Sequence, residues 1–159
     1  MDQTMNKILI IDDDIDDLSG DGGLASDEDR GYMAFYVQEL RDQQFDVSVV
    51  STVEEALRLV EHSSFDLFIV DLMMDPGGIF DRNDTGNGLK TGARILDRIF
   101  QHDDKARVII LSNYPDFEKV KDGEPCLNRV VLLSKLDTTP NQLANEIKAI
   151  FSVPESSKG

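Results

Sequence analysis

Acidic residues follow two short apolar runs that lie far apart in the sequence. The run Asp12-Asp13-Asp14 comes directly after apolar residues 8–11, and Asp71 comes directly after apolar residues 67–70. Four carboxylates at close range repel one another, so such a group must protonate or bind a cation. Oxygen ligands without His or Cys favour Mg²⁺ or Ca²⁺ over zinc. The two runs therefore predict a site for a hard divalent cation, provided that the fold brings their ends together.

Two further polar side chains follow later apolar runs. Ser112 comes after residues 108–111, and Lys135 comes just after residues 130–133. A carboxylate nucleophile, a hydroxyl, an ammonium group and Mg²⁺ together make a site for a phosphoryl group, because the cations neutralise charge on its equatorial oxygens. The set predicts phosphoryl chemistry if one sheet edge carries all four groups.

The elements that must position these residues alternate along the chain. Short, continuously apolar runs predict buried strands at residues 8–11, 47–50, 67–70, 108–111 and 130–133. Apolar residues at helical spacing predict a helix after each strand, the fourth being a short one over residues 116–121. The other four helices should bury Met33, Tyr36, Val37 and Leu40; Val53, Ala56, Leu57 and Val60; Leu89, Ala93, Leu96 and Ile99; and Leu143, Ile147, Ile150 and Phe151.

This alternation predicts an α/β fold with a five-stranded parallel sheet covered by helices on both faces. In the flavodoxin-like strand order 2-1-3-4-5, the ligand site lies outside the carboxyl ends of strands one and three. Those are the strands that end at Asp12 and Asp71. Gly- and Asp-rich sequence predicts long loops at residues 18–29 and 72–88.

Composition limits the function classes. The chain has 159 residues, which we assign to one domain at residues 1–153 and a disordered polar tail at residues 154–159. With 31 acidic and 16 basic residues the formal charge is −15, which disfavours binding to nucleic acid or to an anionic membrane. A single cysteine, Cys126, excludes an internal disulfide. The sequence shows no run of signal-peptide or membrane-spanning length, so we expect a cytoplasmic protein.

Four motifs stand at the ends of predicted strands: Ile10-Ile11-Asp12-Asp13, Val70-Asp71-Leu72-Met73-Met74, Leu111-Ser112-Asn113 and Leu133-Ser134-Lys135. Together they resemble the motifs of response-regulator receiver domains of two-component phosphorelay signal transduction. The resemblance runs from Lys7 to about Val153 and implies a CheY-like fold. It also implies a stand-alone phosphoprotein that signals by protein–protein interaction and catalyses its own phosphorylation and dephosphorylation, without being an enzyme in the turnover sense.

The resemblance implies a phosphoacceptor and a magnesium site. Asp71 would accept a phosphoryl group from a phosphohistidine on a histidine kinase or phosphotransfer protein. Asp13 would bind Mg²⁺ directly, Asp12 would hold it through water, and the main-chain carbonyl of Met73 would complete the protein ligands. A downstream protein of unknown identity would receive the signal, and the sequence leaves open whether a homodimer forms through the fourth and fifth helical faces.

Two other strand-end residues have implied roles, and two positions depart from the family pattern. Ser112 and Lys135 would each bind a phosphoryl oxygen. Leu136 stands where members usually have Pro after the Lys, and Leu132 stands where an aromatic switch residue is expected. Ser112 would then move strand four and its following loop toward the active state, but the usual coupling of this Ser/Thr to an aromatic residue is expected to be absent or altered. The two long loops beside the site could act as a lid or a partner surface.

Two alternatives remain open at the level of sequence. In the first, the chain is a haloacid-dehalogenase-type phosphatase with Asp12 as nucleophile and Asp14 as general acid, which leaves Asp71 without a task. In the second, the chain is a pseudo-receiver that binds a partner without phosphorylation, as the departures at Leu132 and Leu136 allow. Phosphorylation of the Asp71→Asn and Asp12→Asn variants separates the receiver from the phosphatase, and magnesium-dependent labelling by a phosphodonor would rule out the pseudo-receiver.

Overall fold

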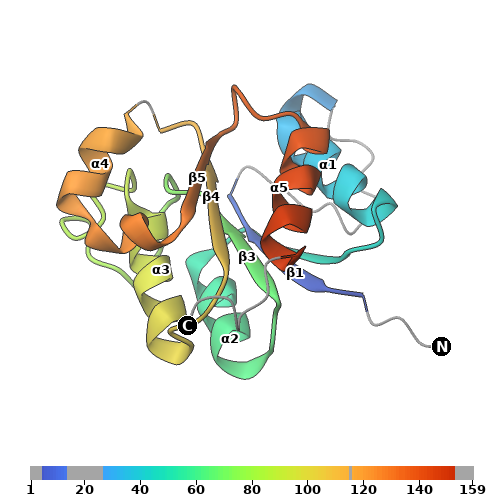
Figure 1. Ribbon diagram of the computed structural model, residues 1–159. Coiled ribbons are helices and arrows are strands. Elements are labelled where there is room, and N and C mark those ends of the chain that lie inside the picture. Colours follow the sequence, from blue (N-terminus) through green and yellow to red (C-terminus); the bar gives the residue numbers. More distant parts are fainter. Residues whose placement is uncertain (1–4, 14–26, 115, 153–159) are drawn as a thin grey trace.

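The computed structural model describes residues 5–13, 27–114 and 116–152, with side chains from residue 33 onward in the second range. Strands and helices alternate along these residues (Figure 1). The strands are β1 (Lys7–Ile11), β2 (Asp46–Val50), β3 (Leu67–Val70), β4 (Val108–Ser112) and β5 (Val131–Ser134). The helices are α1 (Asp27–Asp42), α2 (Val53–His62), α3 (Thr91–His102), α4 (Phe117–Gly123), the 3₁₀ helix η1 (Pro125–Arg129) and α5 (Pro140–Ser152).

The strands form one parallel sheet in the order β2-β1-β3-β4-β5, which confirms the predicted α/β class and strand order. Ile11 at the end of β1 pairs with Val50 of β2 and Val70 of β3. The chain therefore leaves β1 and β3 at the same level of the sheet. This register places Asp12 beside Asp71, although the two residues are far apart in the sequence.

Helices cover both faces of the sheet, which explains why the strands are continuously apolar. Ile8 and Ile10 of β1 pack in a cluster with α1 and α5, whereas Leu9 and Ile11 pack in a cluster with α2, α3, α4 and η1. Figure 1 shows the same division, with α1 and α5 side by side on one side of the sheet. The inner strands β1, β3 and β4 thus bury both sets of alternating side chains, apart from Lys7, whereas the edge strands β2 and β5 are only partly buried.

Two helices begin with the capping residues that the sequence predicts. The Thr52 side chain accepts a hydrogen bond of 3.2 Å from the main-chain nitrogen of Glu55 at the start of α2. At the start of α5, Thr139 and Gln142 bond reciprocally, each main-chain nitrogen donating to the other's side-chain oxygen at 2.8 and 3.1 Å. Pro140 occupies the first helical position, where its missing N–H costs no intrahelical bond.

One predicted core residue is wrong, because α3 starts later than its apolar spacing suggests. Leu89 was expected on the buried face, but it precedes the helix and is 52% exposed. Asn87 and Gly88 both have positive φ angles, and these turns keep the chain out of helical conformation until Thr91. Ala93, Leu96 and Ile99 are buried, as predicted.

The predicted loops have different outcomes. Residues 72–88 contain turns and bends, in agreement with the prediction. The loop predicted at residues 18–29 lies outside the described residues except for its last three positions, which belong to α1. Asp14 also lies outside the described residues. Among the described residues, none of the helices combines the length and apolar character that a membrane span requires.

Candidate functional site

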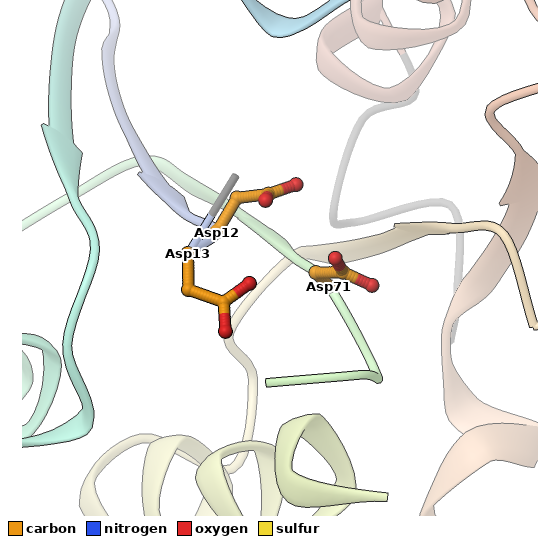
Figure 2. Close-up of side chains that lie close together, drawn as sticks. All are labelled: Asp12, Asp13 and Asp71. Atoms are coloured by element: carbon orange, nitrogen blue, oxygen red, sulfur yellow. The ribbon is translucent and has the colours of Figure 1, made fainter. Parts of the chain in front are cut away.

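Three carboxylates meet at the carboxyl ends of β1 and β3. Figure 2 shows Asp12 and Asp13 leaving β1 beside Asp71, which follows β3. One carboxylate oxygen from each residue lies within 4.8 Å of the others. Asp12 is 1% exposed and Asp71 is 3% exposed, whereas Asp13 is half-buried. The sheet register therefore brings together the three acids that the sequence indicates as the start of a cation site.

Main-chain hydrogen bonds hold two of these acids beyond the strands. The nitrogen of Asp12 donates to the carbonyl oxygen of Val50 at 3.1 Å, and the nitrogen of Asp71 donates to that of Ile11 at 3.0 Å. These bonds continue the sheet pattern by one residue on each strand. The positions of both carboxylates are thus set by the backbone of the sheet.

Lys135 places an ammonium group between two of the acids. Its Nζ lies 2.7 Å from Oδ2 of Asp12 and 3.2 Å from Oδ2 of Asp71, and its side chain is 3% exposed. The main-chain nitrogen of Lys135 donates to the carbonyl oxygen of Ser112 at 3.0 Å, so β4 holds the end of β5 at this level. A buried ammonium with two carboxylate partners offsets much of the cost of removing these charges from water.

Ser112 and Met73 bind the other oxygen of Asp71. The hydroxyl of Ser112, at the buried end of β4, donates to Oδ1 of Asp71 at 2.5 Å. The main-chain nitrogen of Met73 donates to the same oxygen at 3.1 Å. With Lys135 at Oδ2, the Asp71 carboxylate therefore accepts from three donors of different chemical type, which fixes its orientation.

The long loop after β3 also reaches the acidic cluster, through a contact that the sequence analysis missed. The main-chain nitrogen of Asp75 donates to Oδ2 of Asp13 at 3.1 Å. Met74 anchors the loop on both sides, since its nitrogen donates to Gly88 O at 2.9 Å and its carbonyl accepts from Thr91 Oγ1 at 2.5 Å. A main-chain donor carries no side-chain signature, so residue types could not have predicted this contact.

The donor set suits a hard divalent cation. Within the part of the chain that the structure describes, three carboxylates gather at a largely buried site where the ammonium of Lys135 contacts two of them, so negative charge is in excess. Such an excess is unfavourable in a medium of low dielectric constant unless a cation or protons compensate it. Carboxylate oxygens are the ligands that Mg²⁺ and Ca²⁺ prefer. The residues present therefore fit the magnesium ion that the sequence indicates.

Comparisons with known proteins identify the fold. No protein-family model matches the sequence, and no curated protein sequence matches it. A CheY-like response-regulator receiver domain protein from Methanospirillum hungatei JF-1 is similar in structure, with a TM-score of 0.62 and 18% identity over 92% of this chain and 93% of that chain. The chemotaxis response regulator CheY4 of Vibrio cholerae has a TM-score of 0.62 and 20% identity over 92% of this chain and 99% of that chain.

A third similar structure is the BeF3-activated receiver domain of DrrB, which is a Thermotoga maritima OmpR/PhoB homologue. Its TM-score is 0.63, with 19% identity over 94% of this chain and 100% of that chain. At these identities the similarity establishes the fold. The chain has the CheY-like fold of response-regulator receiver domains, as the strand-end motifs predict.

Proposed function

We propose that residues 1–153 form a response-regulator receiver domain, followed by a tail at residues 154–159, and that Asp71 accepts a phosphoryl group from a phosphohistidine. The observation that carries the proposal is the setting of the Asp71 carboxylate. It is buried, it lies within 4.8 Å of the carboxylates of Asp12 and Asp13, and it contacts Ser112 and Lys135. A domain with this function is a signalling module and not an enzyme with repeated turnover of a free substrate.

In this proposal four residues hold Mg²⁺. Asp13 and Asp71 would bind it through their carboxylates, Asp12 would hold it through water, and the main-chain carbonyl of Met73 would be the last protein ligand. When bound, Mg²⁺ supplies positive charge to the oxygens of the transferred group. The excess negative charge of the three acids supports this assignment. The ligand roles of all four residues remain predictions.

The transfer itself uses the Asp71 carboxylate as nucleophile. One carboxylate oxygen attacks phosphorus, the P–N bond of the phosphohistidine breaks, and the imidazole leaves with the bonding electron pair. The Lys135 ammonium and the Ser112 hydroxyl already lie against the attacking group, and there they can bind the phosphoryl oxygens as charge develops on them. Attack of water on the phosphorus of the acyl phosphate would later restore the free carboxylate.

The signal would leave through protein contacts. The Ser112 hydroxyl would transfer its hydrogen bond from Asp71 to a phosphoryl oxygen, and the segment after β4 would move with it. We assign a histidine kinase or phosphotransfer protein as phosphoryl donor and a downstream protein as receiver of the signal, in the cytoplasm. The formal charge of −15 argues against nucleic acid or an anionic membrane as the partner. Stand-alone status and a homodimer remain predictions.

The test is phosphorylation of the whole chain by acetyl phosphate with Mg²⁺, followed by mass spectrometry of the intact protein. The proposal predicts gain of one phosphoryl group in the wild type, loss of this gain in Asp71→Asn, and loss on removal of Mg²⁺. A gain that persists in Asp71→Asn but is lost in Asp12→Asn would identify the dehalogenase-type phosphatase. No gain in the wild type would identify a pseudo-receiver.

A further inference from the structure

The segment that follows Lys135 is attached to α1 by a buried tyrosine. The single hydroxyl proton of Tyr36 is shared between two carbonyl oxygens, that of Thr138, which is the nearer, and that of Lys135 at 3.1 Å. Tyr36 is 1% exposed, and it is separated from these partners by about a hundred positions in the sequence. This hydrogen bond thus connects α1, on one face of the sheet, to the segment after β5 that begins with Lys135.

The two bonded carbonyls flank a short segment with little packing of its own. Leu136 is 74% exposed, so its side chain contributes little buried surface. Two further hydrogen bonds of this segment are local: the nitrogens of Leu136 and Asp137 donate to the side chain and main chain of Ser134, both at 3.2 Å. The bond from Tyr36 is of a different kind, because it ties the segment to a helix that is fixed in the core.

The hydrogen bond from Tyr36 restrains the main chain of Lys135 itself. The nitrogen of this residue donates to Ser112 O at 3.0 Å, and its carbonyl oxygen shares the Tyr36 hydroxyl proton with the carbonyl oxygen of Thr138. The Cα between these two fixed points carries the side chain that reaches Asp12 and Asp71 at 2.7 and 3.2 Å. A lysine side chain has many rotamers, so a fixed Cα greatly reduces the positions open to its Nζ.

We propose that Tyr36 is a positioning residue for the site: its hydroxyl fixes the main chain at Lys135 so that the ammonium stays against Asp71. The positioning itself is independent of phosphorylation. Its consequence for the rate of phosphoryl transfer rests on the proposed function, because the ammonium would there bind a phosphoryl oxygen. Tyr36 takes no part in bond making.

The first experiment measures the position of Lys135 directly, in the absence of any phosphodonor. Wild type and Tyr36→Phe are treated with limiting acetic anhydride, and mass spectrometry gives acetylation of Lys135 relative to the exposed Lys105. Loss of one buried hydrogen bond predicts that this ratio rises about fivefold in Tyr36→Phe. An unchanged ratio would overturn the inference, whatever the outcome for phosphorylation.

A matched control separates positioning from loss of stability. Val37 is the next residue of α1 and is 2% exposed, so Val37→Ala weakens the core without removing a hydroxyl. Its acetylation ratio should stay at the wild-type value while its midpoint of urea unfolding falls. If Val37→Ala raised the ratio as much as Tyr36→Phe does, Lys135 would be labelled through global unfolding and the inference would be wrong.

The second experiment measures phosphorylation by acetyl phosphate with Mg²⁺. Tyr36→Phe should lower the rate at saturating phosphodonor about fivefold, and it should have no further effect in a Lys135→Ala background, because the hydroxyl acts through that side chain. An equal decrease in both backgrounds would contradict the inference and leave the receiver function standing. Absence of phosphorylation in the wild type would refute the receiver function, while the acetylation ratio would still decide the role of Tyr36.

Discussion

Gly92 lies so close to the main chain of Asp71 that a Cβ atom at residue 92 would be 2.2 Å from the Asp71 carbonyl oxygen. The same Cβ would be 2.7 Å from the Cα of Leu72. The nitrogen of Gly92 donates to the carbonyl oxygen of Leu72 at 2.9 Å, which holds the start of α3 against the end of β3. Only glycine permits this approach, since both neighbouring atoms belong to the backbone.

Gly92→Ala should therefore displace the backbone at Asp71. We expect the free energy of unfolding to fall by about 2 kcal/mol or more, as for other overpacked sites, together with slower phosphorylation. Urea unfolding and the rate of acyl phosphate formation check this. Gly78→Ala is the matched control, because a Cβ at Gly78 would have no atom within 4 Å. Equal stability of the two variants would contradict the close approach.

Removal of the Lys135 ammonium should make the chain depend on a divalent cation. In Lys135→Met, the carboxylates of Asp12 and Asp71 lose a buried partner, so without Mg²⁺ the free energy of unfolding should fall by about 3 kcal/mol. Added Mg²⁺ should restore part of this loss, because it binds the folded state preferentially. Urea unfolding with and without Mg²⁺ measures both effects. A stability that Mg²⁺ does not change would count against a cation site among these acids.

The strand ends could be predicted from sequence because two simple patterns coincide there. Short apolar runs predict buried parallel strands, and the carboxyl ends of such strands meet at one edge, so Asp12, Asp71, Ser112 and Lys135 had to lie close together. This prediction depends on strand order alone and needs no knowledge of side-chain packing. Burial of Leu89 was predicted wrongly from sequence. Its spacing fits the apolar face of α3, but the residue lies in the turn before the helix.

Contacts that depend on tertiary geometry could not be predicted in this way. Tyr36 fits the apolar spacing of α1, and nothing in its sequence context indicates that its hydroxyl bonds to the chain near Lys135. Glycine is a residue type typical of loops, but Gly92 lies in α3, where it allows the helix to approach the main chain of Asp71. The main-chain donor of Asp75 has no sequence signature at all. Each of these depends on where a second element lies in space.

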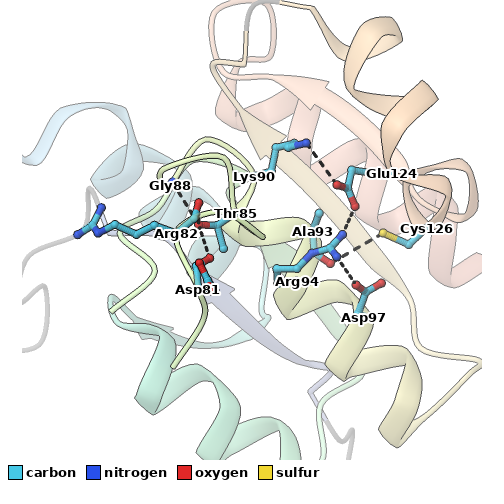
Figure 3. Close-up of polar contacts among 10 residues, drawn as sticks. All are labelled: Asp81, Arg82, Thr85, Gly88, Lys90, Ala93, Arg94, Asp97, Glu124 and Cys126. Carbon is cyan, nitrogen blue, oxygen red and sulfur yellow. Dashed lines mark hydrogen bonds and ion pairs between the residues drawn. The ribbon is translucent and has the colours of Figure 1, made fainter. Parts of the chain in front are cut away.

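The buried residue Glu124, at the end of α4, forms ion pairs with Lys90, just before α3, and with Arg94 of α3. Figure 3 shows Lys90 and Arg94 directed toward Glu124, which is 7% exposed and lies 3.5 Å from the Lys90 ammonium. Glu124→Gln removes the charged partner of Lys90 and one of two charged partners of Arg94, which keeps Asp97 at 3.4 Å. The free energy of unfolding should therefore fall by about 2 kcal/mol. Urea unfolding measures the change.

The matched control for this network is an exposed glutamate on the same helix. Glu118 pairs with Lys121 one turn away, and its side chain is 89% exposed. Glu118→Gln should change stability by less than about 0.5 kcal/mol. If the two Gln variants were equally stable, the buried network would contribute no more than a surface ion pair.

The thiol of Cys126 should react slowly in the folded chain. Burial, and after it the negative charge of Asp97, raise the pKa of Cys126 from 9.0 to about 11, so the thiolate is scarce at neutral pH. Alkylation by iodoacetamide should be much slower than in urea, and Asp97→Asn should accelerate it. Because folding raises the pKa of this thiol, its contribution to the free energy of unfolding is constant below pH 9. Above pH 9 the free energy of unfolding should decrease as the pH rises toward 11. Equal alkylation rates in the folded and unfolded chains would refute this account.

The most direct test of the central claim is to locate the phosphoryl group on the wild-type chain. After incubation with acetyl phosphate and Mg²⁺, borohydride reduces an aspartyl phosphate to homoserine, and peptide mass spectrometry then locates the altered residue. The account predicts homoserine at position 71, dependent on Mg²⁺ and absent without the phosphodonor. Homoserine at position 12, or at no aspartate, would contradict it.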